Sequence, residues 1–149
     1  MKQTLKATKH LSSNDIGKTG SHQAGIHIPK DSRILRLFPK LDENIYNPDQ
    51  MISVEIPQLS AVHNFRFIYY NNRRFSSGTR DEYRLTRMTG TLRDLKAEEG
   101  DFLEFSTGTS TNLIMQLRRK AEKLPEPSSK EEEIPVDKSP RWTVTVRDF

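Results

Sequence analysis

Residues 65–88, FRFIYYNNRRFSSGTRDEYRLTRM, contain two runs of alternating side chains separated by an arginine-rich stretch. The first run places Phe65, Phe67 and Tyr69 on one side of the chain, and residues 82–88 make the second run. Alternation with a period of two is typical of a β-strand with one buried face. A glycine-containing turn at residues 76–79 precedes the second run. The stretch therefore predicts two strands, the second of which begins in a projecting arm.

The same alternation recurs at short intervals along the chain. Two segments predict helical turns, residues 32–38 after a cap at Asp31 or Ser32, and residues 92–97. The remaining strand candidates are residues 2–10, 26–29, 51–56, 101–105, 113–118 and 142–146. About seven or eight strands with one or two short helices indicate a mainly β fold, spaced as in a small closed or nearly closed β structure.

Composition divides the chain into three parts. The 149 residues are the size of one domain, with 33% hydrophobic and 30% charged residues. We expect residues 1–121 to form the globular domain. Residues 122–140 are rich in proline, glutamate, serine and lysine, which is typical of a flexible linker or excursion. Residues 141–149 alternate again, and are either the closing strand of this domain or the start of a following one.

Positive charge is concentrated in the expected globular part. Residues 1–120 carry 19 lysines and arginines against 13 acidic residues, whereas residues 121–149 carry 5 against 7. A basic domain favours polyanionic partners. The absence of cysteine excludes disulfides, cysteine-ligated metals and thiol nucleophiles. The sequence shows neither an apolar run that could span a membrane nor the apolar core of a signal peptide, so we expect a cytoplasmic protein without a membrane partner.

Arginine is chosen exclusively over lysine in residues 69–87, which hold five arginines, no lysine and two adjacent acids, Asp81 and Glu82. Lysine would maintain solubility equally well, but arginine offers a planar fork of donors that binds a guanine edge or a phosphate at two points. In a strand, Arg80, Glu82 and Arg84 share one face. Each arginine can donate to O6 and N7 of a guanine, and the glutamate can accept from a cytosine amino group. The pattern predicts a reader of duplex DNA.

The same residues also allow a simpler interpretation. They would form a ladder of surface salt bridges on a solvent-facing strand, with each pair contributing about 0–1 kcal/mol. In either case the opposite face of the strand would carry Asp81, Tyr83 and Leu85. The glycine-containing turn favours DNA reading, because it would project the strand start as an arm, but the residues alone leave both interpretations open.

Residues 12–25, SSNDIGKTGSHQAG, are a second candidate for DNA contact. Their side chains are of the kinds that bond base edges and phosphates, and Gly17 and Gly20 permit close backbone approach. The alternative is an ordinary solvated loop. The segment GKTGSH lacks the first glycine of a phosphate-binding P-loop, which argues against nucleotide hydrolysis. The candidate contacts in this loop are Asn14, Asp15, Lys18, Thr19, Ser21, His22 and Gln23.

The sequence shows no catalytic motif. A Mg²⁺-dependent nuclease needs acidic residues followed by a glutamate, one spacer and a lysine on a strand, and neither Asp49 with Glu55 nor Asp101 with Glu104 meets that pattern. The four histidines lack metal-binding spacing, and no serine–histidine arrangement for nucleophilic catalysis stands out. We therefore expect no catalytic residue and no metal site in this chain.

Four segments together resemble a known family. They are LSSNDIGKTGSHQAGIHIPK at residues 11–30, LFPKLDE at 37–43, FIYYNNRRF at 67–75 and TRDEYRLTR at 79–87. They are similar to the N-terminal effector-binding domain of EcoRII-type restriction endonucleases, a DNA-binding pseudobarrel related to plant B-three domains. The resemblance covers residues 4–119. It implies a seven-stranded open pseudobarrel that grips the major groove between an N-arm, here residues 12–23, and a C-arm, here residues 80–87.

The resemblance matches Arg80, Glu82 and Arg84 to the C-arm pattern, and the chain departs from one member of that family at Asp81 and Tyr83, where that member has asparagine and lysine. The predicted base-reading residues are Arg80, Glu82, Arg84, Asn14, Asp15, His22 and Gln23. The predicted backbone or arm contacts are Lys9, Ser12, Ser13, Lys18, Thr19, Ser21, Arg66, Asn71, Arg73, Arg74, Asp81, Tyr83 and Arg87.

The leading hypothesis is sequence-specific binding of a short G·C-containing duplex, as the effector or target-recognition domain of a bacterial type II restriction endonuclease. The family implies a C-terminal nuclease domain in the full-length protein, and Mg²⁺ is expected only there. Two alternatives remain open at this point, a compact Mg²⁺-dependent nuclease and a protein-interaction barrel.

Overall fold

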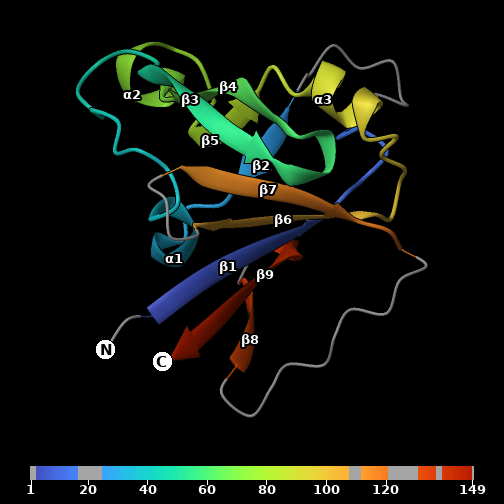
Figure 1. Cartoon of the computed structure of the whole chain (residues 1–149). Coiled ribbons are helices and arrows are strands. Elements are labelled where there is room, and N and C mark those ends of the chain that lie inside the picture. Colours follow the sequence, from blue (N-terminus) through green and yellow to red (C-terminus); the bar gives the residue numbers. More distant parts are fainter. Residues whose placement is uncertain (1–2, 17–24, 108–111, 121–130, 137–138, 149) are drawn as a thin grey trace.

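The computed structural model describes residues 3–16, 25–107, 112–120, 131–136 and 139–148, which form nine strands and a few short helices (Figure 1). The strands are β1 (Gln3–His10), β2 (Ile26–Ile28), β3 (Asp49–Ile56), β4 (Ala61–Tyr70), β5 (Glu82–Thr86), β6 (Phe102–Thr107), β7 (Leu113–Arg118), β8 (Glu131–Val136) and β9 (Ser139–Asp148). The helices are α1 (Ser32–Leu35), the 3₁₀ turn η1 (Pro57–Leu59), α2 (Asn72–Phe75) and α3 (Thr89–Asp94).

All nine strands belong to one sheet with the order β2-β5-β4-β3-β7-β6-β1-β9-β8. Neighbouring strands are antiparallel, except that β3 and β7 run parallel. The prediction of a mainly β fold is confirmed. The implied number of seven strands is too low for the described residues, because β9 and β8 extend the sheet beyond the seven strands that run from β2 to β1.

The sheet curls (Figure 1), and one side-chain bond links its end strand β2 to β9. The indole Nε1 of Trp142 on β9 donates a hydrogen bond to the backbone oxygen of His27 on β2, at 3.2 Å. Because β2 and β9 are not neighbours in the sheet order, this side-chain bond joins strands that no backbone ladder connects. The result is an open pseudobarrel whose seam is bridged by Trp142.

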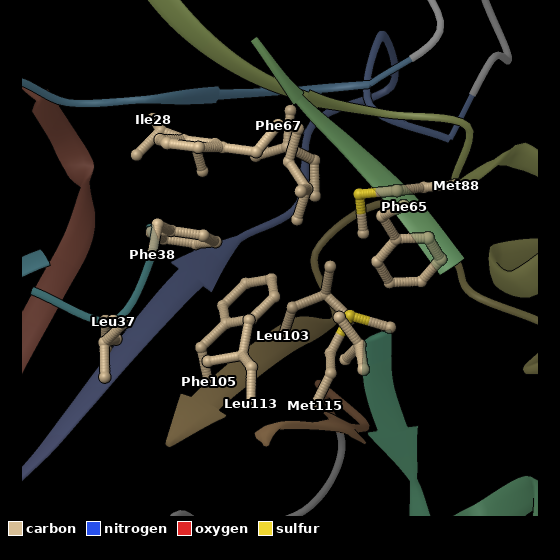
Figure 2. Close-up of a cluster of buried hydrophobic side chains, with 14 of the residues drawn as sticks. Ile28, Leu37, Phe38, Phe65, Phe67, Met88, Leu103, Phe105, Leu113 and Met115 are labelled. Atoms are coloured by element: carbon tan, nitrogen blue, oxygen red, sulfur yellow. The ribbon is translucent and has the colours of Figure 1, made fainter. Parts of the chain in front are cut away.

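Aromatic rings join the two halves of the core. Figure 2 shows Phe38, from the segment after α1, between Phe67 of β4 and Phe105 of β6. The centroid distances are 4.7 Å to Phe67 and 6.2 Å to Phe105, within the range of favourable ring contacts. Stacking continues from Phe67 to Tyr83 at 5.5 Å and from Phe105 to Trp142 at 5.9 Å. These rings connect β5 with β9 through the interior.

The helices are short and lie at the ends of strands (Figure 1). Asp31 caps α1, as one of the two predicted caps, because its side chain accepts from the backbone N–H of Arg33 at 2.9 Å. The second predicted helix begins earlier than expected, at Thr89, and α2 and η1 were not predicted. In the described part of the chain, no helix is both long and apolar enough to cross a membrane.

The last strand pairs along almost the whole of β1, from Gln3 opposite Asp148 to Lys9 opposite Trp142. Trp142 and Val144 are buried on the inner side of the sheet. β9 is therefore a strand of this sheet. β8 lies within the segment 122–140, for which we expected a linker or excursion, and pairs with β9.

Candidate nucleic-acid interface

Three adjacent strands, β2, β5 and β4, carry polar side chains on their outer face. Arg84 of β5 lies in register between His27 of β2 and Ile68 of β4, and Glu82 lies beside Tyr70 of β4. The residues between Glu82 and Thr86 alternate, with every second side chain buried, as the strand parity predicts. We use the name β5 face for the set His27, Tyr70, Arg80, Glu82 and Arg84.

Glu82 is the centre of the β5 face. Its Oε1 accepts from Arg80 Nε at 3.0 Å and Nη2 at 2.9 Å, and from Arg84 Nε at 3.4 Å. Burial acts to raise the pKa of Glu82, but the hydrogen bond from Arg80 and the charge of Arg84 outweigh it and hold this pKa below its ordinary value. At neutral pH one ionised carboxylate thus holds two arginines side by side.

His27 completes this group of side chains. Its Nε2 lies 3.9 Å from Glu82 Oε2. Burial lowers the pKa of His27, although the Glu82 carboxylate acts in the opposite direction. The imidazole is therefore neutral at neutral pH, and it offers the β5 face a donor or an acceptor rather than a charge.

Arg80 is held by a ring as well as by Glu82. Its guanidinium carbon lies 3.7 Å from the centroid of the Tyr70 ring, an arrangement that favours a cation–π interaction. Because one side of the Arg80 guanidinium stacks on the Tyr70 ring and its Nε and Nη2 bond Glu82, the group points in a fixed direction. A ligand that replaces Glu82 as acceptor therefore meets an arginine that has already lost much of its conformational freedom.

Asp81 ties the arm to the segment that follows β2. Its Oδ1 lies 2.6 Å from Lys30 Nζ and also accepts from the Tyr69 hydroxyl. The hydrogen bonds from Lys30 and then Tyr69 hold the pKa of Asp81 below its ordinary value. Burial, followed by the bond to Asp81, raises the pKa of Tyr69 to about 12. The predicted arm residue Asp81 is therefore exposed but bonded to two side chains of the protein itself, and these bonds fix the residue before β5.

Tyr83 does not have the position that we predicted for a backbone contact. Its side chain is only 8% exposed and stacks on Phe67 at 5.5 Å and on Tyr69 at 4.3 Å. Its hydroxyl donates to Glu43 Oε1 at 3.4 Å, and burial raises its pKa to about 12. Tyr83 lies on the inward face of β5, where it supports the β5 face from behind, and not on the outward face with Glu82 and Arg84.

Asn71 is likewise an internal brace and not a surface contact, since it is only 1% exposed. Its Nδ2 donates to the backbone oxygens of Ile45 at 2.7 Å and Glu43 at 3.3 Å, and its Oδ1 accepts from the N–H of Asn47 at 2.7 Å. Arg74 donates to the same Glu43 oxygen at 3.1 Å. These bonds fix the loop before β3 to α2, at the base of the arm.

The remaining predicted arginines lie at the surface. Arg73 and Arg87 are exposed, and Arg87 adopts a positive φ of 65° directly after β5. The N–H of Arg73 donates to the backbone oxygen of Arg80 at 3.1 Å, which closes the turn between α2 and the arm. Arg66, on the outer side of β4, pairs with Asp49 at 2.6 Å. The exposed cations Arg73 and Arg74 thus lie in α2, before the arm, and the exposed Arg87 lies directly after β5.

The described part of the predicted N-arm is held together by a buried ion pair. Lys9 Nζ lies 3.3 Å from Asp15 Oδ2, which also accepts from the N–H of Ser12 at 2.9 Å. Burial lowers the pKa of Lys9, against the effect of Asp15. Lys9, Ser12 and Asp15 therefore form the base of the loop, and Lys9 is too buried for the predicted DNA contact. Asn14 is exposed and Ser13 half-buried.

The predicted contacts Lys18, Thr19, Ser21, His22 and Gln23 lie outside the described residues. Among the residues that are described, no cluster of three or more histidines and acids is arranged to hold a metal ion.

Residues 1–109 match the protein family described as "Restriction endonuclease EcoRII, N-terminal". The chain belongs to this family. One curated relative is the type II restriction enzyme EcoRII of Escherichia coli. It is 39% identical to this chain over 85 residues, which cover 53% of this chain and 20% of the enzyme. The chain thus matches about a fifth of the length of that enzyme.

Two solved structures have a fold similar to that of this chain. An Arabidopsis FUS3–DNA complex has a TM-score of 0.59 at 20% identity, covering 76% of this chain and 96% of that one. The B3 domain of the UbaLAI restriction endonuclease with cognate DNA has a TM-score of 0.54 at 18% identity, covering 81% of this chain and 71% of that one. At such identities the likeness shows the shared pseudobarrel fold.

Sequence reasoning missed three residues that the structure brings to this site, namely His27, Lys30 and Tyr70. For His27 a signal exists in the sequence, because it is the polar residue in the middle of the apolar strand IHI and must face away from the core. The contacts of Lys30 with Asp81 and of Tyr70 with Arg80 join segments that are distant or irregular in sequence, and no local pattern predicts them.

Proposed function

We propose that this member of the EcoRII N-terminal family binds double-stranded DNA at a specific sequence, as the effector or target-recognition domain of a type II restriction enzyme. The observation that carries the proposal is the β5 face, where one carboxylate holds two arginines on the outer surface of the sheet. Two further findings support it. Both similar solved structures are complexes with DNA, and the curated relative is a type II restriction enzyme.

The β5 face carries donors and an acceptor that suit a G·C pair in the major groove. Arg80 and Arg84 can donate to O6 and N7 of guanines, and Glu82 can accept from a cytosine amino group. In the free protein the arginines donate to Glu82 through partly exposed pairs, each worth about 0–1 kcal/mol. A bidentate guanine contact provides about 1–3 kcal/mol of discrimination. Replacing the arginine–glutamate pairs by arginine–guanine contacts therefore lowers the free energy at the correct base pair. At another base pair the arginines lose Glu82 without gaining a guanine, and the free energy rises.

The exposed arginines of α2 and the arginine directly after β5 contact the phosphates of the duplex. Arg73, Arg74 and Arg87 are charged at every physiological pH and lie at the surface of the arm and just beyond β5. Contacts of this kind release counterions, carry no sequence information and weaken with salt. They orient the domain on the duplex, whereas Arg80, Glu82 and Arg84 select the site.

The finer parts of the proposal concern the whole protein. The target is a short site containing G·C pairs, and cleavage belongs to a nuclease domain elsewhere in the full-length enzyme, in the bacterial cytoplasm. The length of the curated relative, of which the matched segment is a fifth, supports such a division of labour. In this proposal the present domain needs no cofactor, and Mg²⁺ acts only in the nuclease domain.

Selection from a pool of random duplexes tests the proposal. We expect one short sequence to be enriched, and we call the recovered DNA the selected duplex. It should bind about a thousandfold or more tightly than a scrambled duplex at the same salt concentration. Absence of any enrichment or binding at low salt would instead favour a protein-interaction barrel. Cleavage of plasmid by the purified chain with Mg²⁺ would favour a compact nuclease.

A further inference from the structure

A cavity of about 410 Å³ lies beside α1, and its described lining contains no residue of the β5 face. One wall comes from α1 and the segment that follows it, between residues 32 and 43. The other wall is the inner side of β4 and β5, through Phe67 and Tyr83. This volume is in the range of sites that hold a small molecule. A ligand in the cavity would therefore leave the outer surface of β5 free.

The inner wall of this cavity is aromatic and preformed. Phe38, Phe67 and Tyr83 lie in one stack, with successive ring planes 15° and 12° apart. Phe38 and Tyr83 keep a small part of their surface exposed, 7% and 8%, and both line the cavity. Leu35 and Leu41 add aliphatic surface. Because the rings are already fixed by packing in the core, a flat apolar group can bind against them with little reorganisation.

Two exposed cations line the same cavity. They are Arg36 and Lys40, and among the described residues neither side chain has an ion-pair or hydrogen-bond partner. The one acid in the described lining is Glu43, whose carboxylate accepts from the Tyr83 hydroxyl at 3.4 Å. The charged groups of the lining thus carry one positive charge in excess. Both cations are available to bind a carboxylate, a sulfonate or a phosphate.

We propose that this cavity binds a small amphipathic anion, with a flat apolar part against Phe38 and Tyr83 and an anionic group at Arg36 and Lys40. The apolar contact supplies most of the affinity, because water weakens charge pairs at exposed side chains. The two cations supply the preference for an anion over a neutral molecule of the same shape. Such a site lies on the inner side of β5 and does not depend on the DNA contacts of the proposed function.

Two fluorescent probes test the site. One is anilinonaphthalene sulfonate, and the other is phenylnaphthylamine, which has the same rings and no sulfonate. We expect both to bind the wild type, and we expect the double variant Arg36→Ala, Lys40→Ala to bind the sulfonate about three- to tenfold more weakly while keeping its affinity for the neutral probe. The matched control is Arg93→Ala with Lys96→Ala, which removes two exposed cations outside the cavity lining and should change neither affinity.

A second variant, Leu35→Trp, fills the cavity from the half-exposed side of α1. We expect it to unfold cooperatively in urea and to bind neither probe. Unchanged binding of both probes by folded Leu35→Trp, or no binding by the wild type, would overturn the site.

The charge variant is decisive even if Leu35→Trp does not fold. Unchanged affinity for the sulfonate, or an equal loss for the neutral probe, would overturn the preference for an anion. Each of these outcomes leaves the proposed function intact, because no DNA contact enters the measurements.

Discussion

Glu82→Gln separates DNA reading from a salt-bridge ladder, because it removes the charge at the centre of the β5 face and keeps its shape. The carboxylate accepts two bonds from Arg80 and one from Arg84, and its side chain is 24% exposed. An amide oxygen retains part of this bonding, and water screens the rest. We expect the free energy of unfolding to fall by about 1–2 kcal/mol at neutral pH.

The effect on stability should depend on pH. The pKa of Glu82 is held below its ordinary value in the folded protein, so ionised Glu82 stabilises the fold above the pKa of an unfolded glutamate, about 4.3. This stabilisation is lost as the pH falls through the lower folded-state pKa. The difference in stability between the wild type and Glu82→Gln should therefore be full at neutral pH and vanish in acid, as urea denaturation over a pH series would measure.

The effect on binding decides between the two interpretations. If Glu82 accepts from a cytosine, replacing the carboxylate by the weaker amide acceptor removes up to about 1–3 kcal/mol of discrimination, or up to about 150-fold in the affinity ratio of selected to scrambled duplex. Affinity for the scrambled duplex should be unchanged or slightly higher, because a negative charge has left a DNA-facing surface. Fluorescence anisotropy with labelled duplexes at one fixed salt concentration measures both.

Glu104→Gln is the matched control. Glu104 of β6 accepts from Arg118 at 2.6 Å and lies 3.3 Å from Lys6, so it also holds two cations, but it is remote from β5 in the sheet. It should lose stability and keep the affinity ratio. An unchanged ratio in Glu82→Gln, with stability lost as in Glu104→Gln, would refute base reading by Glu82 and leave the salt-bridge ladder.

The remaining predictions concern the surroundings of the β5 face. Arg73→Ala should weaken binding to all duplexes alike and reduce the slope of log affinity against log salt by about one, and an unchanged slope would exclude a phosphate contact. Tyr69 and Tyr83 should ionise near pH 12 in an ultraviolet titration; since unfolded tyrosines ionise near pH 10, their contribution to stability is full below about pH 10 and is lost as the pH rises towards 12. Tyr69→Phe should remove one of these late steps. Asn71→Ala should lower the free energy of unfolding by about 2–4 kcal/mol in urea, since three bonds are lost, whereas a change below about 1 kcal/mol would contradict its role as a brace.

Strand positions were predictable where one face of the strand is apolar. The alternation of Phe65 and Phe67 located β4, and that of Tyr83 and Leu85 located β5. β8 was not predicted because its residues Glu131–Val136 have the composition of a linker. Its pairing with β9 depends on the tertiary structure and has no local signal in the sequence. α2 was not predicted because its four residues are too few to show a helical period. The helix is held in place by bonds from Asn71 to a loop that is distant in sequence.

The site was predictable where local parity decides the direction of a side chain. Parity correctly placed Glu82 and Arg84 on the outer face of β5. It also implied that Tyr83 faces inward, but the family pattern led us to place it among the contacts, and its burial against Tyr69 shows that parity was the better guide. The burial of Lys9 depends on Asp15 and on the coverage by β9, which arise only from tertiary structure.

Interference by guanine methylation tests most directly whether the β5 face reads bases in the major groove. Dimethyl sulfate methylates guanine N7, the acceptor that an arginine fork requires. We expect methylation of particular guanines in the selected duplex to abolish binding by the wild type, and we expect Arg84→Ala to lose this interference at one of them while retaining the others. A pattern without preferred guanines, or one identical in Arg84→Ala and the wild type, would contradict base reading by the β5 face.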